Sequence, residues 1–239
     1  MKTITAVGVA AVGLSLVLAG CSPDEKASTA TTSATPGVWT GSPAPADGAG
    51  EGRGGAADAE APAAGATLHQ YIVDNKIAEV PFRKDEAGTP TIDFPFPPDW
   101  VAAGDRTPDW AYGAIVYGKP VDPNDEPFMY AIASKLTGDV DPNTILDLAS
   151  GQLDELPDFE PVNGPPERTT FGGFDAVSYS GTFVEEGKPR VVGQETIVIP
   201  GNGALFVLQL NGEAPKGQEQ VVIDAANLIR EKTTITLPS

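Results

Sequence analysis

Any histidine- or cysteine-based catalysis in this chain would have to use His69 or Cys21, because the 239 residues include one histidine and one cysteine. A Ser-His-Asp triad would need His69 as its general base. The sequence contains no G-x-S-x-G motif, which presents the nucleophilic serine in many hydrolases. His69 lies near the start of a predicted amphipathic helix, so we expect it to face solvent without a catalytic role.

One acidic cluster has the spacing of a calcium site. Asp139, Asp141 and Asn143 match the opening of an EF-hand loop. The glycine that such a loop requires is absent, because Thr144 follows, and its twelfth position would be Ser150 instead of glutamate. An aspartate followed by proline is also a strong helix start, which accounts for Asp141. We therefore expect no metal site and no cofactor.

Carboxylates are the remaining candidates for catalysis. Region 67–239 contains 27 Asp and Glu residues, and two of them could form the catalytic pair of a glycan hydrolase. No local pattern selects two of them, so this alternative requires two carboxyl groups facing one cleft, at least one with a raised pKa. The net charge of −18 excludes nucleic acid as a partner, because binding phosphates requires a basic surface.

The sequence around Cys21 predicts lipid attachment. Lys2 gives the chain a positive start, and the fifteen uncharged residues at 4–18 are too few for a spanning helix, which needs about 20. These features are typical of an export signal. Residues 18–21, Leu-Ala-Gly-Cys, resemble the lipobox of bacterial lipoproteins. This resemblance implies that signal peptide 1–20 is removed and that Cys21 carries an S-diacylglyceryl and an N-acyl group, which together anchor a protein stably.

The composition changes after Cys21. Of the 45 residues from 22 to 66, 35 are Ala, Gly, Pro, Ser or Thr, so we expect 21–66 to be the lipidated cysteine followed by a disordered tether. A flexible chain of this length spans roughly 35–40 Å. We expect a single globular domain at 67–239, which is long enough to bury a core without disulfides or metals.

The folded region is predicted to combine helices with an antiparallel sheet. Amphipathic periodicity and capping residues predict helices at 68–75, 142–156 and 218–230. Apolar runs predict strands at 91–94, 112–117, 128–136, 176–184, 190–199 and 204–210, with 233–237 as an edge strand or a packed tail. Segment 204–208 is apolar at every position, which predicts a central strand covered by helices. The expected fold class is α+β, with an antiparallel sheet covered by helices.

Three aromatic residues could contact a ligand. Trp100, Trp110 and Tyr112 lie in or beside irregular stretches at strand ends, where a sugar or an acyl chain can stack. The alternative is that they cover the core from the side.

Many short segments of the folded region resemble one family. The segments are 71–77, 90–93, 98–100, 115–117, 122–125, 134–142, 196–200, 206–211, 224–227 and 233–236. In this order, behind a lipobox and a polar tether, they resemble the LpqN/LpqT lipoproteins of mycobacteria. The resemblance implies a PsbP-like α/β/α sandwich on the extracytoplasmic face of the cell membrane. It also implies no active-site motif and an association with the export of mycolate-type glycolipids beside membrane transporters.

The leading functional hypothesis is a membrane-anchored binding protein of the cell envelope without enzymatic activity. It would act as a carrier or an adaptor in glycolipid trafficking. Its partners would be the membrane through the lipid anchor, an amphiphilic lipid or glycolipid, and membrane lipid transporters or other envelope proteins. The alternatives are the carboxylate-dependent glycan hydrolase and a pure protein-interaction module, which would present a large flat apolar patch and no deep pocket. The sequence assigns no ligand-binding residue.

Overall fold

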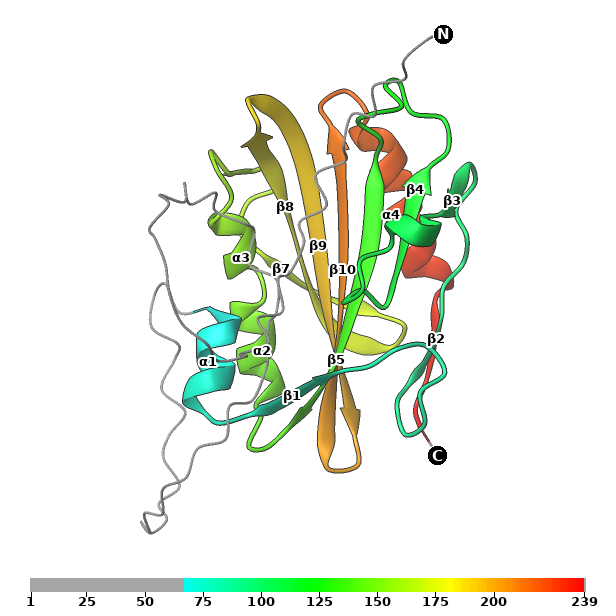
Figure 1. The fold of residues 1–239 in the computed structure, drawn as a ribbon. Coiled ribbons are helices and arrows are strands. Elements are labelled where there is room, and N and C mark those ends of the chain that lie inside the picture. Colours follow the sequence, from blue (N-terminus) through cyan, green and yellow to red (C-terminus); the bar gives the residue numbers. More distant parts are fainter. Residues whose placement is uncertain (1–66, 239) are drawn as a thin grey trace, which may run out of the picture. The chain divides into compact units, whose positions relative to one another are not determined.

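The computed structural model describes residues 67–238, and the expected signal peptide, Cys21 and tether lie outside the described residues. Within this range an antiparallel sheet carries helices on both faces (Figure 1). The helices are α1 (Leu68–Asp74), α2 (Pro142–Leu148), α3 (Gly151–Asp154) and α4 (Glu219–Lys232), with a 3₁₀ helix at Gly104–Arg106. The strands are β1 (Ala78–Pro81), β2 (Thr91–Asp93), β3 (Trp100–Ala102), β4 (Gly113–Tyr117), β5 (Phe128–Thr137), β6 (Glu160–Pro161), β7 (Glu167–Phe171), β8 (Phe174–Glu185), β9 (Lys188–Gly201), β10 (Ala204–Pro215) and β11 (Thr234–Thr236).

Nine of these strands form one sheet. Its main order is β3-β4-β5-β10-β9-β8-β6, while β1 pairs with β5 and β7 pairs with β8. The β8–β9 and β9–β10 connections are the hairpins that their glycine-containing turns favour. The other two strands, β2 and β11, form a separate antiparallel pair. The α+β class predicted from the sequence is confirmed, and β10 lies in the middle of the sheet.

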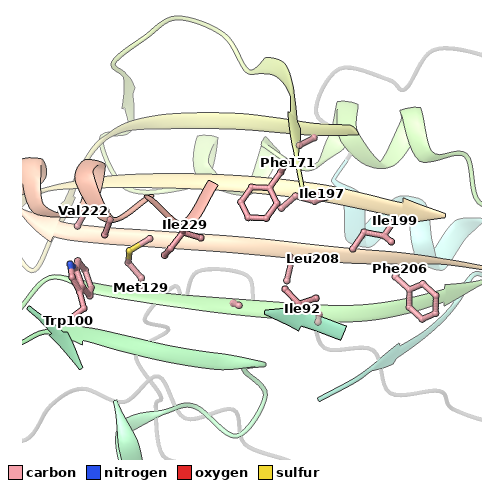
Figure 2. Close-up of a cluster of buried hydrophobic side chains, with 14 of the residues drawn as sticks. Ile92, Trp100, Met129, Phe171, Ile197, Ile199, Phe206, Leu208, Val222 and Ile229 are labelled. Atoms are coloured by element: carbon pink, nitrogen blue, oxygen red, sulfur yellow. The ribbon is translucent and has the colours of Figure 1, made fainter. Parts of the chain in front are cut away.

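Two apolar clusters occupy opposite faces of this sheet. On one face, Leu136 and Val207 belong to the cluster that includes α1 and α2. On the other face, Leu208 packs in the cluster that includes Ile229 of α4 (Figure 2). Adjacent residues of β10 therefore serve opposite layers, because successive side chains of a strand point to opposite faces. This arrangement explains why segment 204–208 is apolar throughout.

The helix starts agree with the sequence, whereas one helix is shorter than expected. The Thr67 hydroxyl caps α1 by accepting a hydrogen bond of 3.2 Å from the Gln70 backbone N–H. Asp141 caps α2, as predicted. The single helix predicted over 142–156 is wrong, because the helix breaks before Gly151 and resumes as α3. The break consists of Ala149 and Ser150, whose backbone angles stay in the right-handed helical region.

The sheet is larger than the sequence predicted. A hairpin joins β7 to β8 through Gly172 and Gly173, which have positive φ values of 57° and 87°. Strands β1, β3, β6 and β7 were not predicted, because each is short and mostly exposed and so lacks apolar alternation. The segment left open as an edge strand or a tail contains β11, which pairs with β2.

Arg190 joins three segments at one end of the sheet. It lies in β9, and its side chain is 7% exposed. Its guanidinium contacts Asp125 in the β4–β5 loop, Glu213 in β10 at 2.7 Å and Glu185 in β8 at 3.3 Å. Burial raises the pKa of Asp125, but the hydrogen bond and the charge of Arg190 outweigh burial and hold this pKa below its usual value. The loop is therefore tied to the strands by a largely buried ionic network.

Candidate functional site

The sheet face that carries α1–α3 changes from apolar to polar along β10. Leu205 and Val207 belong to the apolar cluster that includes residues of α1 and α2. The next two residues on the same face are Gln209 and Asn211, which are 3% and 6% exposed. Amide side chains are mostly found at protein surfaces, so two of them buried on a central strand call for a partner.

Gln194, Thr196, Gln209 and Asn211 form what we call the polar block. They are two directly opposed pairs of β9 and β10, Gln194–Asn211 and Thr196–Gln209. Nε2 of Gln194 donates to Oδ1 of Asn211 at 3.2 Å, and Nε2 of Gln209 donates to Oε1 of Gln152 in α3 at 3.5 Å. Within the described region, Oγ1 of Thr196 and Nδ2 of Asn211 are buried without a hydrogen-bond partner. An unpaired buried polar atom costs about 1–3 kcal/mol, so the block retains hydrogen-bonding capacity for a ligand or for water.

A recess opens beside the polar block. It is lined by Ile132 and Ser134 of β5 and by Val207 and Gln209 of β10. These residues face one another across the two strands as the pairs Ile132–Gln209 and Ser134–Val207. The recess is shallow, and its volume of about 10 Å³ is room for one water molecule. It lies where the apolar part of this sheet face, at Val207, meets the polar part, at Gln209.

Glu79 adds a titratable group next to this recess. The register of β1 and β5 places it opposite Leu136. Burial raises the pKa of its carboxyl group to about 7, although the adjacent Ser134 hydroxyl lowers it. Its Oε1 atom is buried and has no hydrogen-bond partner in the described region. The recess and Glu79 thus share Ser134 as a neighbour.

An aromatic group lies next to the polar block, further along β5 from the recess. Tyr130 lies directly across from Asn211 in the sheet. Its ring centroid is 5.3 Å from that of Trp110, in an edge-to-face arrangement, and 5.7 Å from that of Phe128. Burial, and secondarily the charge of Glu213, raise the pKa of the Tyr130 hydroxyl far above its usual value. Tyr130 therefore remains a neutral hydrogen-bond donor at physiological pH.

The structure divides the three aromatic residues singled out from the sequence between the two faces. Trp110 is partly buried beside Tyr130, on the face of the polar block. Trp100 is buried in the opposite cluster, 5.7 Å from Tyr117 (Figure 2). Tyr112 packs on that same cluster at 5.9 Å from Phe82. Both residues therefore agree with the alternative that these side chains cover the core.

The carboxyl groups with raised pKa values do not form a glycosidase pair. Burial raises the pKa values of Glu79, Glu195 and Glu213, and an arginine neighbour partly offsets this for the last two. Glu79 and Glu213 pair with opposite ends of β5, eight residues apart, which is about 27 Å. Glu195 pairs with Arg230 of α4 on the other face, at 3.0 Å. The two carboxyls of a glycosidase lie within about 10 Å of each other, so these three cannot act together.

The remaining candidates from the sequence are His69 and the acidic cluster that contains Asp141. His69 is exposed on α1. Asp141 accepts hydrogen bonds from the Asn143 N–H at 3.0 Å and from the Thr144 hydroxyl at 2.8 Å, so its oxygens are occupied in capping α2. In the described region no three His, Cys, Asp or Glu side chains gather in a way that could hold a metal ion.

Sequence reasoning missed the polar block, although a signal for it exists. Positions 205, 207, 209 and 211 read Leu, Val, Gln, Asn within one continuous strand. An inward-facing series that changes from aliphatic to amide residues, without any break in the strand, indicates a buried polar surface.

Comparisons with known proteins agree with the fold. Residues 64–236 match the protein family described as "Probable lipoprotein LpqN". The chain is 50% identical to lipoprotein LpqN of Mycobacterium tuberculosis H37Rv over 240 residues, which cover 99% of this chain and 100% of the relative. It is also similar to the crystal structure of LpqN described as involved in cell envelope biogenesis of Mycobacterium tuberculosis. That structure has a TM-score of 0.67 and 47% sequence identity, over 72% of this chain and 98% of the other.

Proposed function

This chain belongs to the LpqN family of lipoproteins, and from this membership we propose that it is a lipid-anchored, non-catalytic binding protein of the cell envelope. In this proposal it binds amphiphilic glycolipids of the mycolate type and passes them to membrane transporters or other envelope proteins. The anchor is Cys21, on the extracytoplasmic face of the membrane. The named relative's role in envelope biogenesis supports the cellular setting, and the chemistry of one sheet face supports the ligand class.

The observation that carries the proposal is the change from apolar to polar along β10. An amphiphile lying along this strand would place its acyl end at Ile132 and Val207 and its headgroup over Gln209 and Asn211. The unpaired atoms of the polar block would then receive hydrogen bonds from, or donate them to, sugar hydroxyls. The Tyr130–Trp110 pair offers an aromatic surface for the sugar ring beside them.

Replacing Thr196 with valine is expected to weaken binding of a synthetic trehalose monoester about fivefold without unfolding the protein. Valine keeps the shape of threonine and removes only the unpaired hydroxyl, and one hydrogen bond contributes about 1 kcal/mol. Tryptophan fluorescence during titration of the exported chain measures the affinity. Thr233→Val is the matched control, because the Thr233 hydroxyl is also buried and unpaired but lies at the end of α4.

Three results would contradict this proposal. Equal losses of affinity in the Thr196→Val and Thr233→Val variants would show that the binding site is not at the polar block. Equal affinity for monoesters with short and with long acyl chains would show that the acyl chain does not contribute to binding. Release of free glucose during incubation, by cleavage of the glycosidic bond, would favour the glycan hydrolase over a binding protein. Native mass spectrometry of the purified protein, in search of co-purified lipid, tests the ligand class independently.

Replacing Cys21 with alanine is expected to abolish membrane attachment and leave the fold intact. The lipid would be the anchor, and residues 22–66 separate Cys21 from the folded region. No helix within residues 67–238 is long and apolar enough to cross a membrane; the longest, α4, has 14 residues. Detergent phase partitioning of the exported protein measures the attachment. If the alanine variant still enters the detergent phase, something other than Cys21 anchors the chain.

A further inference from the structure

Four side chains form a row across the sheet, which we call the cross-sheet row. The registers of β8, β9, β10 and β5 place them in line, each opposite the next: Tyr179, Gln194, Asn211 and Tyr130. Directly opposed residues of neighbouring strands point to the same face, so the two amides of the polar block have a tyrosine ring on each side. Neighbouring strands lie about 4.8 Å apart, so the row is about 14 Å long.

Each end of the cross-sheet row is widened by a second aromatic side chain. The Trp110 ring lies 5.3 Å from that of Tyr130, and the Phe159 ring lies 5.4 Å from that of Tyr179. All four rings are partly exposed. The two amides between them are buried, and Nδ2 of Asn211 has no hydrogen-bond partner in the described region. The row therefore offers two partly open aromatic surfaces joined by amide groups.

This combination of groups suits an extended, proline-rich peptide. Such peptides adopt the polyproline II conformation, whose backbone N–H and C=O groups make no internal hydrogen bonds. Domains that recognise these peptides use surfaces lined by aromatic side chains. The amides of Gln and Asn can both donate hydrogen bonds to a peptide backbone and accept them from it. At about 3.1 Å per residue, four to five residues in this conformation match the length of the row.

The chain itself contains such a segment. Residues 36–45 read Pro-Gly-Val-Trp-Thr-Gly-Ser-Pro-Ala-Pro, and Trp39 is the only aromatic residue between Cys21 and Thr67. Residues 27–46 carry no charged side chain. An uncharged segment fits a row whose hydrogen-bonding groups are neutral, because no charge has to be removed from water without a partner.

The linker between this segment and the folded region is long enough for the segment to reach the row. The 21 residues at 46–66 join it to Thr67, and a flexible chain of this length spans roughly 25 Å. Leu68, where α1 begins, belongs to the same apolar cluster as Val207. Asn211 lies four residues further along β10, about 13 Å away. A linker that matches its span gives a local concentration in the millimolar range, so even a weak contact would be populated.

We propose that residues 36–45 dock on the cross-sheet row of their own chain, with Trp39 against the Tyr130 end and Pro43 against the Tyr179 end. Trp39 and Pro43 are four positions apart, about 12 Å in the polyproline II conformation, which is close to the length of the row. In this direction the chain leaves the row at β8, the strand on which α2 and α3 pack. It thus continues toward the layer in which α1 begins.

Docking has a consequence at each end of the segment. The docked segment covers the surface that the proposed function assigns to a ligand, although the docking goes beyond that function and does not require it. It also leaves residues 22–35 between Cys21 and the row, a span of roughly 20 Å instead of the 35–40 Å of the whole tether. The prolines at 36, 43 and 45 restrict the segment to extended conformations, which lowers the entropy cost of docking.

Cleavage by chymotrypsin tests the docking, because this protease cuts after large apolar side chains and Trp39 is its one such target in residues 22–66. The substrate is the chain of residues 21–239 with Cys21→Ala, and mass spectrometry follows cleavage of the bond after Trp39. We expect this bond to be cleaved about tenfold more slowly than in a synthetic peptide of residues 30–50, since cleavage follows the population of undocked chain.

Two variants and a matched control locate the docking. Trp110→Ala removes one aromatic surface of the row and should raise the cleavage rate about fivefold. Phe96→Ala is the control, because Phe96 is a 61% exposed aromatic residue outside the row, and it should leave the rate unchanged. Joint replacement of Pro43→Ala and Pro45→Ala leaves the folded region untouched. It should raise the rate about threefold relative to a peptide with the same changes.

Three outcomes would overturn the docking. Equal cleavage rates in the chain and in the peptide would show that the segment is free, and would leave the proposed function standing because no ligand takes part in the test. Equal rate increases in Phe96→Ala and Trp110→Ala would show that the segment does not lie on the cross-sheet row. Protection that grows with protein concentration would show that the segment docks on a second copy of the chain instead of its own.

Discussion

Replacing Arg190 with methionine is expected to lower the free energy of unfolding by about 3–5 kcal/mol, the cost of breaking a buried ion pair from one side. Methionine keeps much of the apolar stem of arginine but leaves Glu213 without its cation and Asp125 with only the exposed Lys188, at 3.5 Å. The β4–β5 loop also loses its buried ion pair with β9. For a domain of this size the melting temperature should fall by about 10 °C or more. Chemical denaturation, followed by circular dichroism, measures the free energy.

Arg168→Met is the matched control for this prediction. Arg168 binds Asp147 and the Asn143 carbonyl, but both of its partners are exposed, so its loss should cost under about 1 kcal/mol. Adding Glu213→Gln to Arg190→Met should restore part of the stability, because it removes one stranded charge. Similar losses in Arg190→Met and Arg168→Met would mean that the Arg190 network contributes no more than a surface ion pair.

Replacing Glu79 with glutamine is expected to stabilise the protein by about 2–3 kcal/mol at pH 8 and to leave its stability unchanged near pH 4. The pKa of Glu79 is raised to about 7 in the folded protein from 4.5 in the unfolded chain. Below pH 4.5 both states are protonated and burial has no cost. Between pH 4.5 and pH 7 the unfolded chain releases its proton first, so the folded state loses stability as the pH rises. Glutamine has no proton to lose.

Thermal unfolding of both proteins across pH 4 to 8 checks this prediction without any ligand. The difference between the two curves should begin near pH 4.5 and level off above pH 7. A constant difference at all pH values would show that Glu79 ionises normally and that glutamine acts through packing alone. Because this measurement is independent of ligand binding, it tests the ionisation of Glu79 directly.

The sequence predicts the layers of this fold better than its site. Segment 204–208 is apolar on both faces, and that pattern identifies a central strand correctly because burial on two sides leaves no polar position. Asp141 and Thr67 predict helix starts, since capping depends on neighbouring residues. Local patterns leave open whether Trp100 faces a ligand or the core, because its orientation depends on pairing with Tyr117, 17 residues further along the chain.

The candidate site depends on contacts between residues far apart in the chain. Burial raises the pKa of Glu79, and that burial arises when β1 pairs with β5, more than fifty residues further along the chain. The polar block likewise forms when β9 and β10 pair in one register. A shift of one residue would turn Gln209 and Asn211 into the opposite core. Such a site follows from the register of the sheet, which single-sequence patterns do not specify.

The two-sided use of β10 has a consequence for protein engineering. Residues with odd numbers from 205 to 211 face the α1–α3 layer, whereas Phe206 and Leu208 face the α4 layer. A combinatorial library confined to the odd positions would therefore sample new ligand preferences while the even positions hold the opposite core constant. Whether a β10 residue has an odd or an even number thus decides whether it can be varied or must be kept.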